Sequence, residues 1–379
     1  MIKEVELKNF KSYKKEKFSM KNLTLFCGSN SVGKSTVIQS IAGFLQTGNR
    51  SPFRLNGELI RLGRKEDIHS FFNVDSDELS IEIVGDDFQV KWGYFDAEGR
   101  ENTPPQELPL ISNQGNEKTP ENLIFQYLHA ERLGPRDNLV LSESQKGENW
   151  LGIQGEYTFE VLSKIRTERR SSLRLSPDEH RMHANSKGNS QVFHNIVLWM
   201  SEISPGYGIN PETIIEANVS YNSIDIASET SIGVSGHKSR PINIGFGFSY
   251  ALSVVTALLL AKPGELVILE NPEAHLHPKG QSYLGRLIAL TSISGVQVIV
   301  ETHSDHLLNG IRVIFRINDS FDNSEFALYY ISQEKSISKA QYISLQDNSA
   351  LSSWPEGFFD QQALDMYKIA TGKDLRDEK

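Results

Sequence analysis

The chain has 379 residues, of which 38% are apolar and 23% charged, and it carries a net charge of −9. This composition excludes disordered and collagen-like classes, and its single cysteine, Cys27, excludes an intrachain disulfide. The acidic balance argues against nucleic-acid binding by the whole surface, so any such contact needs a local basic patch. A charged N-terminal stretch and short apolar runs predict a cytoplasmic protein without a membrane span.

The first half of the chain predicts strands at residues 2–7 and 23–27, then a Gly-rich loop and a helix over 36–45. Short β-like runs over 50–120 predict an antiparallel lobe. A further strand is expected at 123–129. The segment 152–204 has mostly helical patterns, which indicate a helical insertion.

The second half predicts a strand-like stretch at 213–221, a polar loop at 228–240 and an apolar helix at 250–260. Two short β-rich runs follow at 265–269 and 296–300, with a helix at 279–291 between them. Such runs are typical of strands buried on both faces of a parallel sheet. The pattern therefore predicts an α/β fold.

Residues 28–36 form the sequence GSNSVGKST, a full match to the phosphate-loop pattern G-x-x-x-x-G-K-[ST]. The glycines allow successive backbone N–H groups to surround a phosphate at a helix N-terminus, where the helix dipole favours anions. Lys34 is expected to reach the β- and γ-phosphates and Ser35 to bind Mg²⁺. A Gly-rich turn that only caps a helix is the alternative. The predicted nucleotide-binding residues are Gly28, Ser29, Asn30, Ser31, Val32, Gly33, Lys34, Ser35 and Thr36.

A buried run that ends in a carboxylate is the second motif. Glu270 is expected to be the first polar residue after the strand, and such a carboxylate can hold Mg²⁺ through its water shell. Without the first motif, a strand that merely reaches solvent would be the better explanation of this glutamate. A zinc site on His275, His277 and His303 is a weaker alternative, because the first two are only two residues apart and lack a helical pair.

The third motif is a strand end that delivers His303 to the same edge of the sheet. Ligands of open α/β sheets bind outside the carboxyl ends of the strands, so Lys34, Glu270 and His303 are expected to converge. The fourth is Gly245 and Gly247 at the start of a helix, where glycines can form an anion site or simply a tight turn.

In this order and spacing, the motifs resemble the ATP-binding-cassette (ABC) type heads of the RecF, SMC and OLD families of ATPases. Residues 5–13 resemble the opening strand of these heads, and residues 28–36 resemble their Walker A loop. Residues 245–249 correspond to the signature motif, 266–270 to the Walker B strand and 302–304 to the switch-histidine strand. The closest resemblance is to bacterial OLD-like ATPases with a small C-terminal module of unknown function and no TOPRIM nuclease domain. It rests on residues 130–136, 245–247, 270–278 and 354–360.

The resemblance implies an α/β ABC-type P-loop head with an antiparallel β lobe and a helical insertion. It divides the chain into the first part of the head at 1–150, the insertion at 151–210, the second part of the head at 211–312 and a C-terminal module at 313–379. It implies ATP and Mg²⁺ as cofactors. It also implies a homodimer or higher homo-oligomer in which Walker A of one protomer and the signature helix of the other enclose each ATP.

Two positions depart from the family pattern. Gly245 stands where the signature serine is usual, and Asn271 stands where most such ATPases have the catalytic glutamate. Because an amide cannot accept a proton from water, Asn271 can at most orient the nucleophile, and Glu273 or His303 has to compensate if turnover is not slow. The predicted catalytic residues are Glu270, Asn271, Glu273 and His303.

A basic cluster in the insertion predicts either a phosphate-contacting stripe for DNA or, more plainly, a solvated helix face. It consists of Lys164, Arg166, Arg169, Arg170, Arg174 and Arg181. The insertion is too short for the long coiled coil of SMC proteins, so a chromosome-tethering role is disfavoured.

Three functions fit these features. The leading hypothesis is a slow ATPase that regulates a partner effector, a nuclease or toxin supplied in trans. The family resemblance alone implies its setting, which is bacterial antiphage or mobile-element defence. The second is a RecF-like DNA-binding repair clamp or loader. A self-contained nuclease is less favoured, because the residues after 312 lack the carboxylate pattern of a nuclease site, and the nearest carboxylates, Asp319 and Asp322, fall in a predicted loop.

Overall fold

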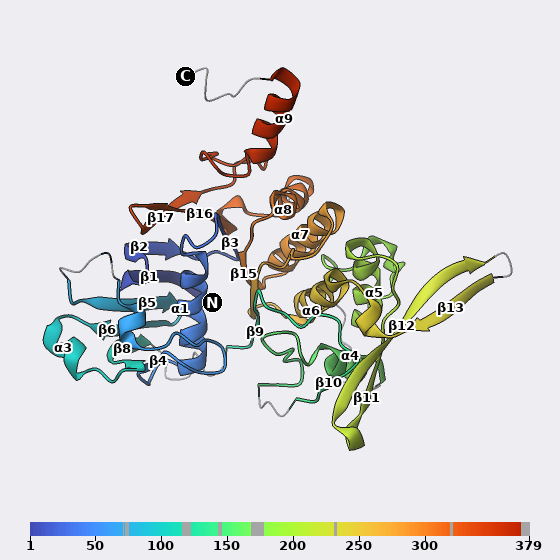
Figure 1. Cartoon of the computed structure of the whole chain (residues 1–379), viewed down its shortest axis with the longest axis horizontal. Helices are drawn as coiled ribbons and strands as arrows, with labels where there is room; N and C mark the ends of the chain where they lie inside the picture. Colours follow the sequence, from blue (N-terminus) through green and yellow to red (C-terminus); the bar gives the residue numbers. More distant parts are fainter. Residues whose placement is uncertain are drawn as a thin grey trace.

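A computed structural model describes residues 1–70, 72, 76–115, 123–142, 146–167, 178–230, 233–318 and 321–372. Two large sheets dominate this part of the chain, with helix α1 (Lys34–Thr47) packed between them and a group of helices on the far face of the central sheet (Figure 1). The arrangement confirms the predicted α/β fold.

The central sheet has six strands in the order β17–β16–β3–β15–β14–β9. Its strands are parallel except for β17, which pairs antiparallel with β16. The middle strands are mostly apolar because their side chains alternate between two buried cores. Because the strands β16, β3, β15, β14 and β9 are parallel, their carboxyl ends lie at the same edge of the sheet. The strands are β3 (Leu23–Gly28), β9 (Phe125–Leu128), β14 (Leu266–Glu270), β15 (Gln297–Glu301), β16 (Phe326–Glu334) and β17 (Ile337–Ile343).

The second sheet is the antiparallel lobe, in the order β2–β1–β5–β6–β8. It confirms a lobe within 50–120 but also takes in the start of the chain. Its strand β2 was not predicted, because only Tyr13 and Phe18 are buried in a strand that is otherwise charged and polar. The lobe contains β1 (Ile2–Phe10), β2 (Tyr13–Ser19), β5 (Leu79–Gly85), β6 (Phe88–Tyr94), β8 (Leu110–Gly115), the small ladder of β4 (Phe53–Arg54) and β7 (Glu107–Leu108), and the short helices α2 (Lys65–Ile68) and α3 (Ala97–Asn102).

The buried residues of helices α4 to α8 form one hydrophobic core with the central sheet. The described parts of the segment 152–204 include α4 and α5, in keeping with the predicted helical insertion. The helices are α4 (Thr158–Thr167), α5 (Val192–Ile203), α6 (Phe246–Leu260), α7 (Pro278–Ile293) and α8 (Asp305–Ile317). Among the described helices, we find none with the length and apolar character needed to cross a bilayer.

The predicted polar loop at 228–240 is wrong. Strand β12 (Val219–Thr230) continues through this region and pairs antiparallel with β13 (Gly233–Ser239), and the hairpin projects from the body (Figure 1). The hairpin is formed by backbone pairing between the two strands, and such pairing cannot be recognised from the pattern of polar and apolar residues. At its base, β12 also pairs with β10 (Leu139–Val140) and β11 (Asn210–Ile214).

The expected C-terminal module at 313–379 is partly built into the head. α8 extends into it, and β16 lies directly beside β3 at the centre of the sheet. Only the last described helix, α9 (Gln361–Thr371), stands away from the body (Figure 1). The segment therefore contributes strands to the same sheet that carries the phosphate loop.

The described members of the insertion's basic cluster, Lys164, Arg166 and Arg181, do not form one exposed stripe. Lys164 Nζ lies 2.6 Å from a carboxylate oxygen of Glu160, and the guanidinium of Arg166 lies over the ring of Phe193. Arg169, Arg170 and Arg174 lie outside the described residues.

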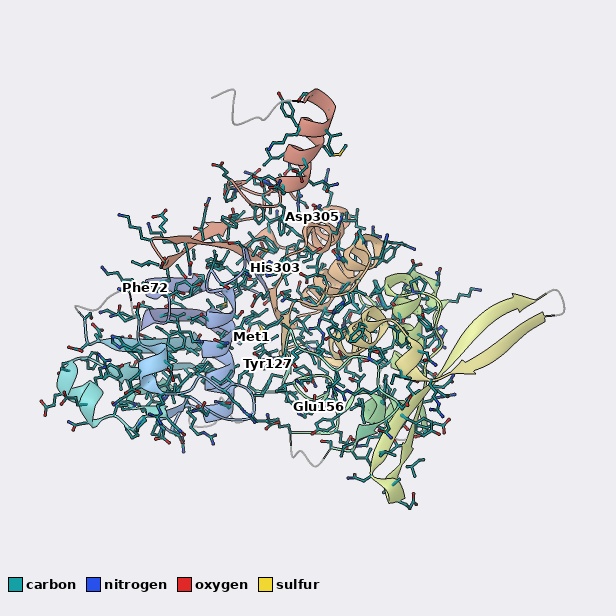
Figure 2. All side chains as sticks on the ribbon, in the orientation of Figure 1. Met1, Phe72, Tyr127, Glu156, His303 and Asp305 are labelled. Carbon is teal, nitrogen blue, oxygen red and sulfur yellow. The ribbon has the colours of Figure 1, made fainter. Side chains whose placement is uncertain are left out.

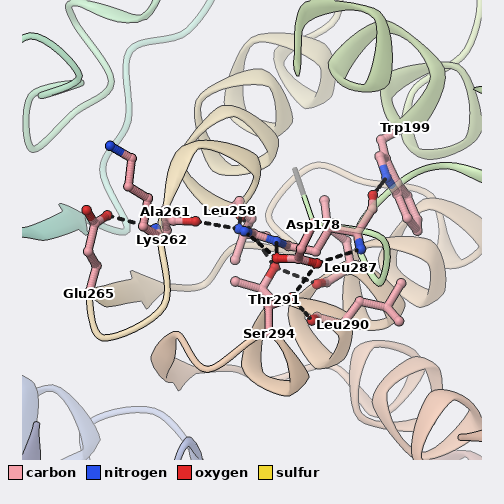
Figure 3. A network of polar contacts seen from close by, with 11 residues as sticks. Asp178, Trp199, Leu258, Ala261, Lys262, Glu265, Leu287, Leu290, Thr291 and Ser294 are labelled. Atoms are coloured by element: carbon pink, nitrogen blue, oxygen red, sulfur yellow. Dashed lines mark hydrogen bonds and ion pairs between the residues drawn. The ribbon is translucent and has the colours of Figure 1, made fainter. Parts of the chain in front are cut away.

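The prediction of a phosphate contact is wrong for Arg181, which is buried. Its guanidinium donates to the carbonyl oxygens of Leu258 at 2.7 Å and Ala261 at 2.6 Å, at the C-terminal end of α6. It also pairs with Asp178, which in turn accepts a hydrogen bond from Ser294 (Figure 3). The last carbonyls of a helix lack helical partners and attract cations, so Arg181 fastens the insertion to the core.

Candidate nucleotide-binding site

The loop between β3 and α1 requires glycine at both ends. Gly28 has φ +142°, and a Cβ there would lie 2.2 Å from the carbonyl oxygen of Ile331. Gly33 has φ +106°, and a Cβ there would lie 2.7 Å from the Ser338 hydroxyl. Because L-residues avoid both conformations and both spaces are occupied, only glycine fits. The loop thus has the predicted strand–loop–helix setting, with Gly33 as the N-cap of α1.

Lys34 opens α1 and lies almost wholly inside the protein. Its ammonium donates to the carbonyl oxygen of Ser29 at 2.6 Å and lies 3.8 Å from a carboxylate oxygen of Glu301. Burial lowers the pKa of Lys34, since a charged ammonium is less favourable away from water. A polyanion that entered the loop would meet this cation directly.

Glu301, the last residue of β15, is the site residue that sequence reasoning missed. Its carboxylate accepts a hydrogen bond of 2.8 Å from the Ser35 hydroxyl. Burial raises the pKa of Glu301 to about 7, and the neighbouring charge of Glu270 adds to the effect. A signal existed: both parallel strands β14 and β15 end in glutamate, and the two residues are register partners.

The strand β14 ends one residue later than predicted, so Glu270 is the last residue of the strand rather than the first after it. Its carboxylate accepts a hydrogen bond of 2.7 Å from the hydroxyl of Tyr127 on β9. The guanidinium of Arg132 donates to the backbone carbonyls of Glu270 and Asn271, both at 2.7 Å, and holds the turn after the strand. The Ser35 hydroxyl thus pairs with Glu301, and a shared Mg²⁺ site of Ser35 and Glu270 stays a prediction.

The turn after Glu270 carries Asn271 in a left-handed conformation, with φ +44°, which asparagine tolerates better than most residues. Its N–H donates to the carbonyl oxygen of Glu301 at 2.8 Å. Its side-chain Oδ1 is buried, and no described protein group donates to it. Asn271 lines the cavity described below, and its buried oxygen is an acceptor without a described protein partner.

Glu273 and His303 lie together. A carboxylate oxygen of Glu273 accepts the backbone N–H of His303 at 2.8 Å, and burial raises the pKa of Glu273. Burial and the nearby charge of Lys34 lower the pKa of His303, so a neutral imidazole is favoured. Glu273 therefore holds the backbone that presents His303. Figure 2 shows His303 and Tyr127 in the middle of the molecule.

A cavity of about 610 Å³ lies at this edge of the sheet. Its walls come from the phosphate loop, the sheet edge and the β lobe, and Glu270 and Glu273 do not line it. The lining residues are Lys11, Ser12, Asn30, Ser31, Gly33, Lys34, Ser35, Thr36, Gln39, Asp67, Phe72, Asn271, Glu301 and His303. Of the three residues expected to converge, Lys34 and His303 line this cavity and Glu270 does not.

The donor set fits a nucleotide with its cation. The site offers the Lys34 ammonium, the N-terminus of α1 and the paired Ser35 hydroxyl and Glu301 carboxylate, which suit phosphate oxygens and a hard divalent ion. The described residues contain no cluster of three or more His, Cys, Asp or Glu that would hold a metal alone. A cation here would need phosphate oxygens and water to complete its coordination, as Mg²⁺ does when it accompanies a nucleotide.

The three histidines of the zinc alternative have separate environments. His277 is the N-cap of α7, and its ring nitrogen accepts the N–H of Lys279. His275 packs against the rings of Phe246 and Tyr250. These contacts favour structural roles for both.

Gly245 and Gly247 begin α6 outside the cavity lining. Gly245 is the N-cap, with φ −64°, and a Cβ there would meet nothing within 4 Å. A Cβ on Gly247 would lie 2.5 Å from the carbonyl oxygen of His275. Gly247 is thus required by packing within the chain, whereas Gly245 is open.

Family profiles match three stretches of the chain. An AAA ATPase domain matches residues 1–146, and residues 154–309 match a profile described as "AAA domain, putative AbiEii toxin, Type IV TA system". Residues 322–369 match a protein family of unknown function, DUF3696. No curated protein sequence matches the chain significantly.

Three solved SMC heads are among the structures similar to this one. An SMC head bound to the C-terminal winged-helix domain of ScpA is 15% identical with a TM-score of 0.53, over 91% of this chain and 98% of that chain. The SMC head of Thermotoga maritima is 12% identical with a TM-score of 0.43, over 91% and 99%. An SMC head with an extended coiled coil, bound to a ScpA domain derived from Pyrococcus furiosus, is 14% identical with a TM-score of 0.48, over 97% and 99%.

The first of these likenesses establishes the fold, and the two AAA matches cover the phosphate loop and the Glu270 and His303 strands respectively. The chain is therefore a P-loop ATPase with the ABC-type fold of an SMC head.

Proposed function

We propose that this ATPase is a slow switch that dimerises around ATP and Mg²⁺ and thereby regulates an effector protein supplied in trans, in bacterial antiphage defence. The observation that carries the proposal is Asn271. It lines the same cavity as Lys34 and His303, at the position where the family resemblance expects a catalytic glutamate.

The site can hold a nucleotide firmly and still hydrolyse it slowly. Lys34 and the N-terminus of α1 would neutralise the phosphates, and Ser35 with a strand-end carboxylate would hold a cation, which would supply Lewis-acid stabilisation of the charge on the γ-phosphate. Asn271 can orient a water through its unpartnered oxygen but cannot remove its proton. His303, kept neutral by its surroundings, is the other group at hand to contact the γ-phosphate or that water.

Dimerisation around ATP is supported by the open N-terminus of α6. Gly245 caps it with no protein atom within 4 Å of its Cβ direction, so a second protomer's phosphate can approach the backbone N–H groups. If association requires the γ-phosphate, the protein is dimeric with ATP bound and monomeric with ADP bound.

An effector in trans is favoured over an internal nuclease. Of the two carboxylates considered for a nuclease site, Asp319 lies outside the described residues, and Asp322 caps a short helical turn through the N–H of Ser324. The description of the matched AAA profile as a toxin–antitoxin component supports a role in defence. An effector whose activity is unchanged between ATP-bound and ADP-bound forms of this chain would contradict the proposal.

The decisive variant is Asn271→Glu. A positioned general base is worth on the order of 10²- to 10⁴-fold, so phosphate release should be slow in the wild type and faster in this variant. Because φ is +44° at Asn271, Asn271→Gln is the matched control, with the same length and backbone strain but no base. Wild-type turnover that already equals Asn271→Glu, or equal rates for the Glu and Gln variants, would refute the slow switch.

A DNA-binding clamp is the second candidate, and the described part of the basic cluster gives it little support, since Arg181 is buried and Lys164 is paired. DNA affinity that falls steeply with salt would favour the clamp. If the protein does not bind DNA measurably at physiological salt, the clamp is excluded and the switch is retained.

A further inference from the structure

The C-terminal hairpin β16–β17 lies against the outer side of the phosphate loop. Gln333 donates from its side chain to the carbonyl oxygen of Ser31 at 3.1 Å. The Ser338 hydroxyl donates to the next carbonyl oxygen, that of Val32, at 2.5 Å. Two successive loop carbonyls are thus bound by residues more than 300 positions later in the chain.

Ser338 is fixed in place from several directions. It is 1% exposed, its backbone N–H donates to the carbonyl oxygen of Ser12 at 2.8 Å, and the two hydroxyls lie 2.6 Å apart. The hydroxyl also occupies the space beside Gly33 that a Cβ would need. Tyr13 completes the cluster, because its hydroxyl donates to the carbonyl oxygen of Gly33 at 3.0 Å.

A second contact reaches the beginning of the loop. A smaller cavity of about 300 Å³ has Gly28, Ser29 and His303 on one side and the segment 357–361 on the other. The segment is anchored by Phe358, which is 1% exposed and packs its ring against Tyr330 of β16. The C-terminal region thus borders both ends of the loop.

We infer that the C-terminal region 326–361, whose family match has no known function, is a clamp that sets the geometry of the phosphate loop for ATP. The loop binds phosphate through N–H groups, whose direction is fixed when the carbonyls on the same peptide groups are held. Binding Ser31 and Val32 carbonyls from outside turns the N–H groups of the next residues toward the cavity. The inference rests on the chain being an ATPase and is independent of the effector that it regulates.

The test compares Gln333→Ala and Ser338→Ala with Lys339→Ala in the full-length chain. Lys339 is the matched control, because it follows Ser338 on β17 but is exposed and pairs with Glu334 on the neighbouring strand. One net hydrogen bond corresponds to about a 5-fold change in an equilibrium constant. We expect the KM and Kd for ATP to rise about 5-fold in Ser338→Ala and about 2-fold in exposed Gln333→Ala, with kcat unchanged.

The split between KM and kcat separates a clamp from a merely structural role. A lower melting temperature of nucleotide-free Ser338→Ala with wild-type KM would overturn the inference. So would ATP affinities of Gln333→Ala and Ser338→Ala that match Lys339→Ala. If Ser338→Ala does not fold, Gln333→Ala decides, because its side chain is on the surface.

Discussion

Glu301 gives the sharpest prediction, because its carboxylate faces two groups that a nucleotide needs. It lies 3.8 Å from the Lys34 ammonium and accepts the Ser35 hydroxyl at 2.8 Å. Without a divalent cation, this negative charge opposes the phosphates of ATP. With one, the same charge stands beside Ser35 and favours the cation. The variant Glu301→Gln should therefore change ATP affinity in opposite directions with and without Mg²⁺.

The magnitude follows from the geometry. Two unit charges about 4 Å apart interact by about 4 kcal/mol at an effective dielectric constant of 20, and desolvation and reorganisation cancel much of this. A net effect near 1.4 kcal/mol corresponds to about tenfold. We expect Glu301→Gln to bind ATP about tenfold more tightly in EDTA and about tenfold more weakly in Mg²⁺.

Titration calorimetry at pH 8.5 measures both affinities with the carboxylate charged, since the pKa of Glu301 is about 7. Glu270→Gln is the matched control, because Glu270 ends the neighbouring strand in register with Glu301. If Glu270→Gln alone removes the Mg²⁺ dependence, and Glu301→Gln shifts neither affinity, the assignment of the cation to the Ser35–Glu301 pair is refuted.

Two further predictions concern association and pH. Gly245→Asp should weaken ATP-linked dimerisation in sedimentation because its charge would repel the partner's γ-phosphate, whereas Gly245→Asn, an equally good N-cap, should not; equal association would contradict the signature role of Gly245. Burial raises the pKa of Glu301 from 4.5 to about 7. Protonated Glu301 therefore contributes on the order of 3 kcal/mol to the free energy of unfolding below pH 4.5, and this contribution is lost as the pH rises through 7. The nucleotide-free wild type should lose melting temperature relative to Glu301→Gln between pH 5 and 8, and a constant difference would contradict this.

The parts of the fold that the sequence predicted are those with local signals. The phosphate loop combines glycine spacing with a flanking strand and helix, and β14 and β15 are apolar runs because both of their faces are buried. His303 was placed at the site because parallel strands end at one edge. These predictions required no knowledge of tertiary contacts outside the central sheet.

The missed features depend on partners distant in the chain. Glu301 is 266 residues from Ser35, and nothing within its own strand distinguishes it from a glutamate that merely reaches solvent. Arg181 belongs to a basic cluster that patterns like a surface, yet it is buried because the carbonyls at the end of α6 accept its guanidinium. Strand β16 has no local feature that ties it to β3.

The glycines of the phosphate loop show why the motif is less local than its pattern. Their positive φ angles explain part of the requirement, but the space at Gly28 is closed by the carbonyl of Ile331 and the space at Gly33 by the hydroxyl of Ser338. Both neighbours come from the C-terminal hairpin. The loop's shape is therefore a property of the whole sheet, and the region 326–361 cannot be regarded as an appendage to an already complete ATPase.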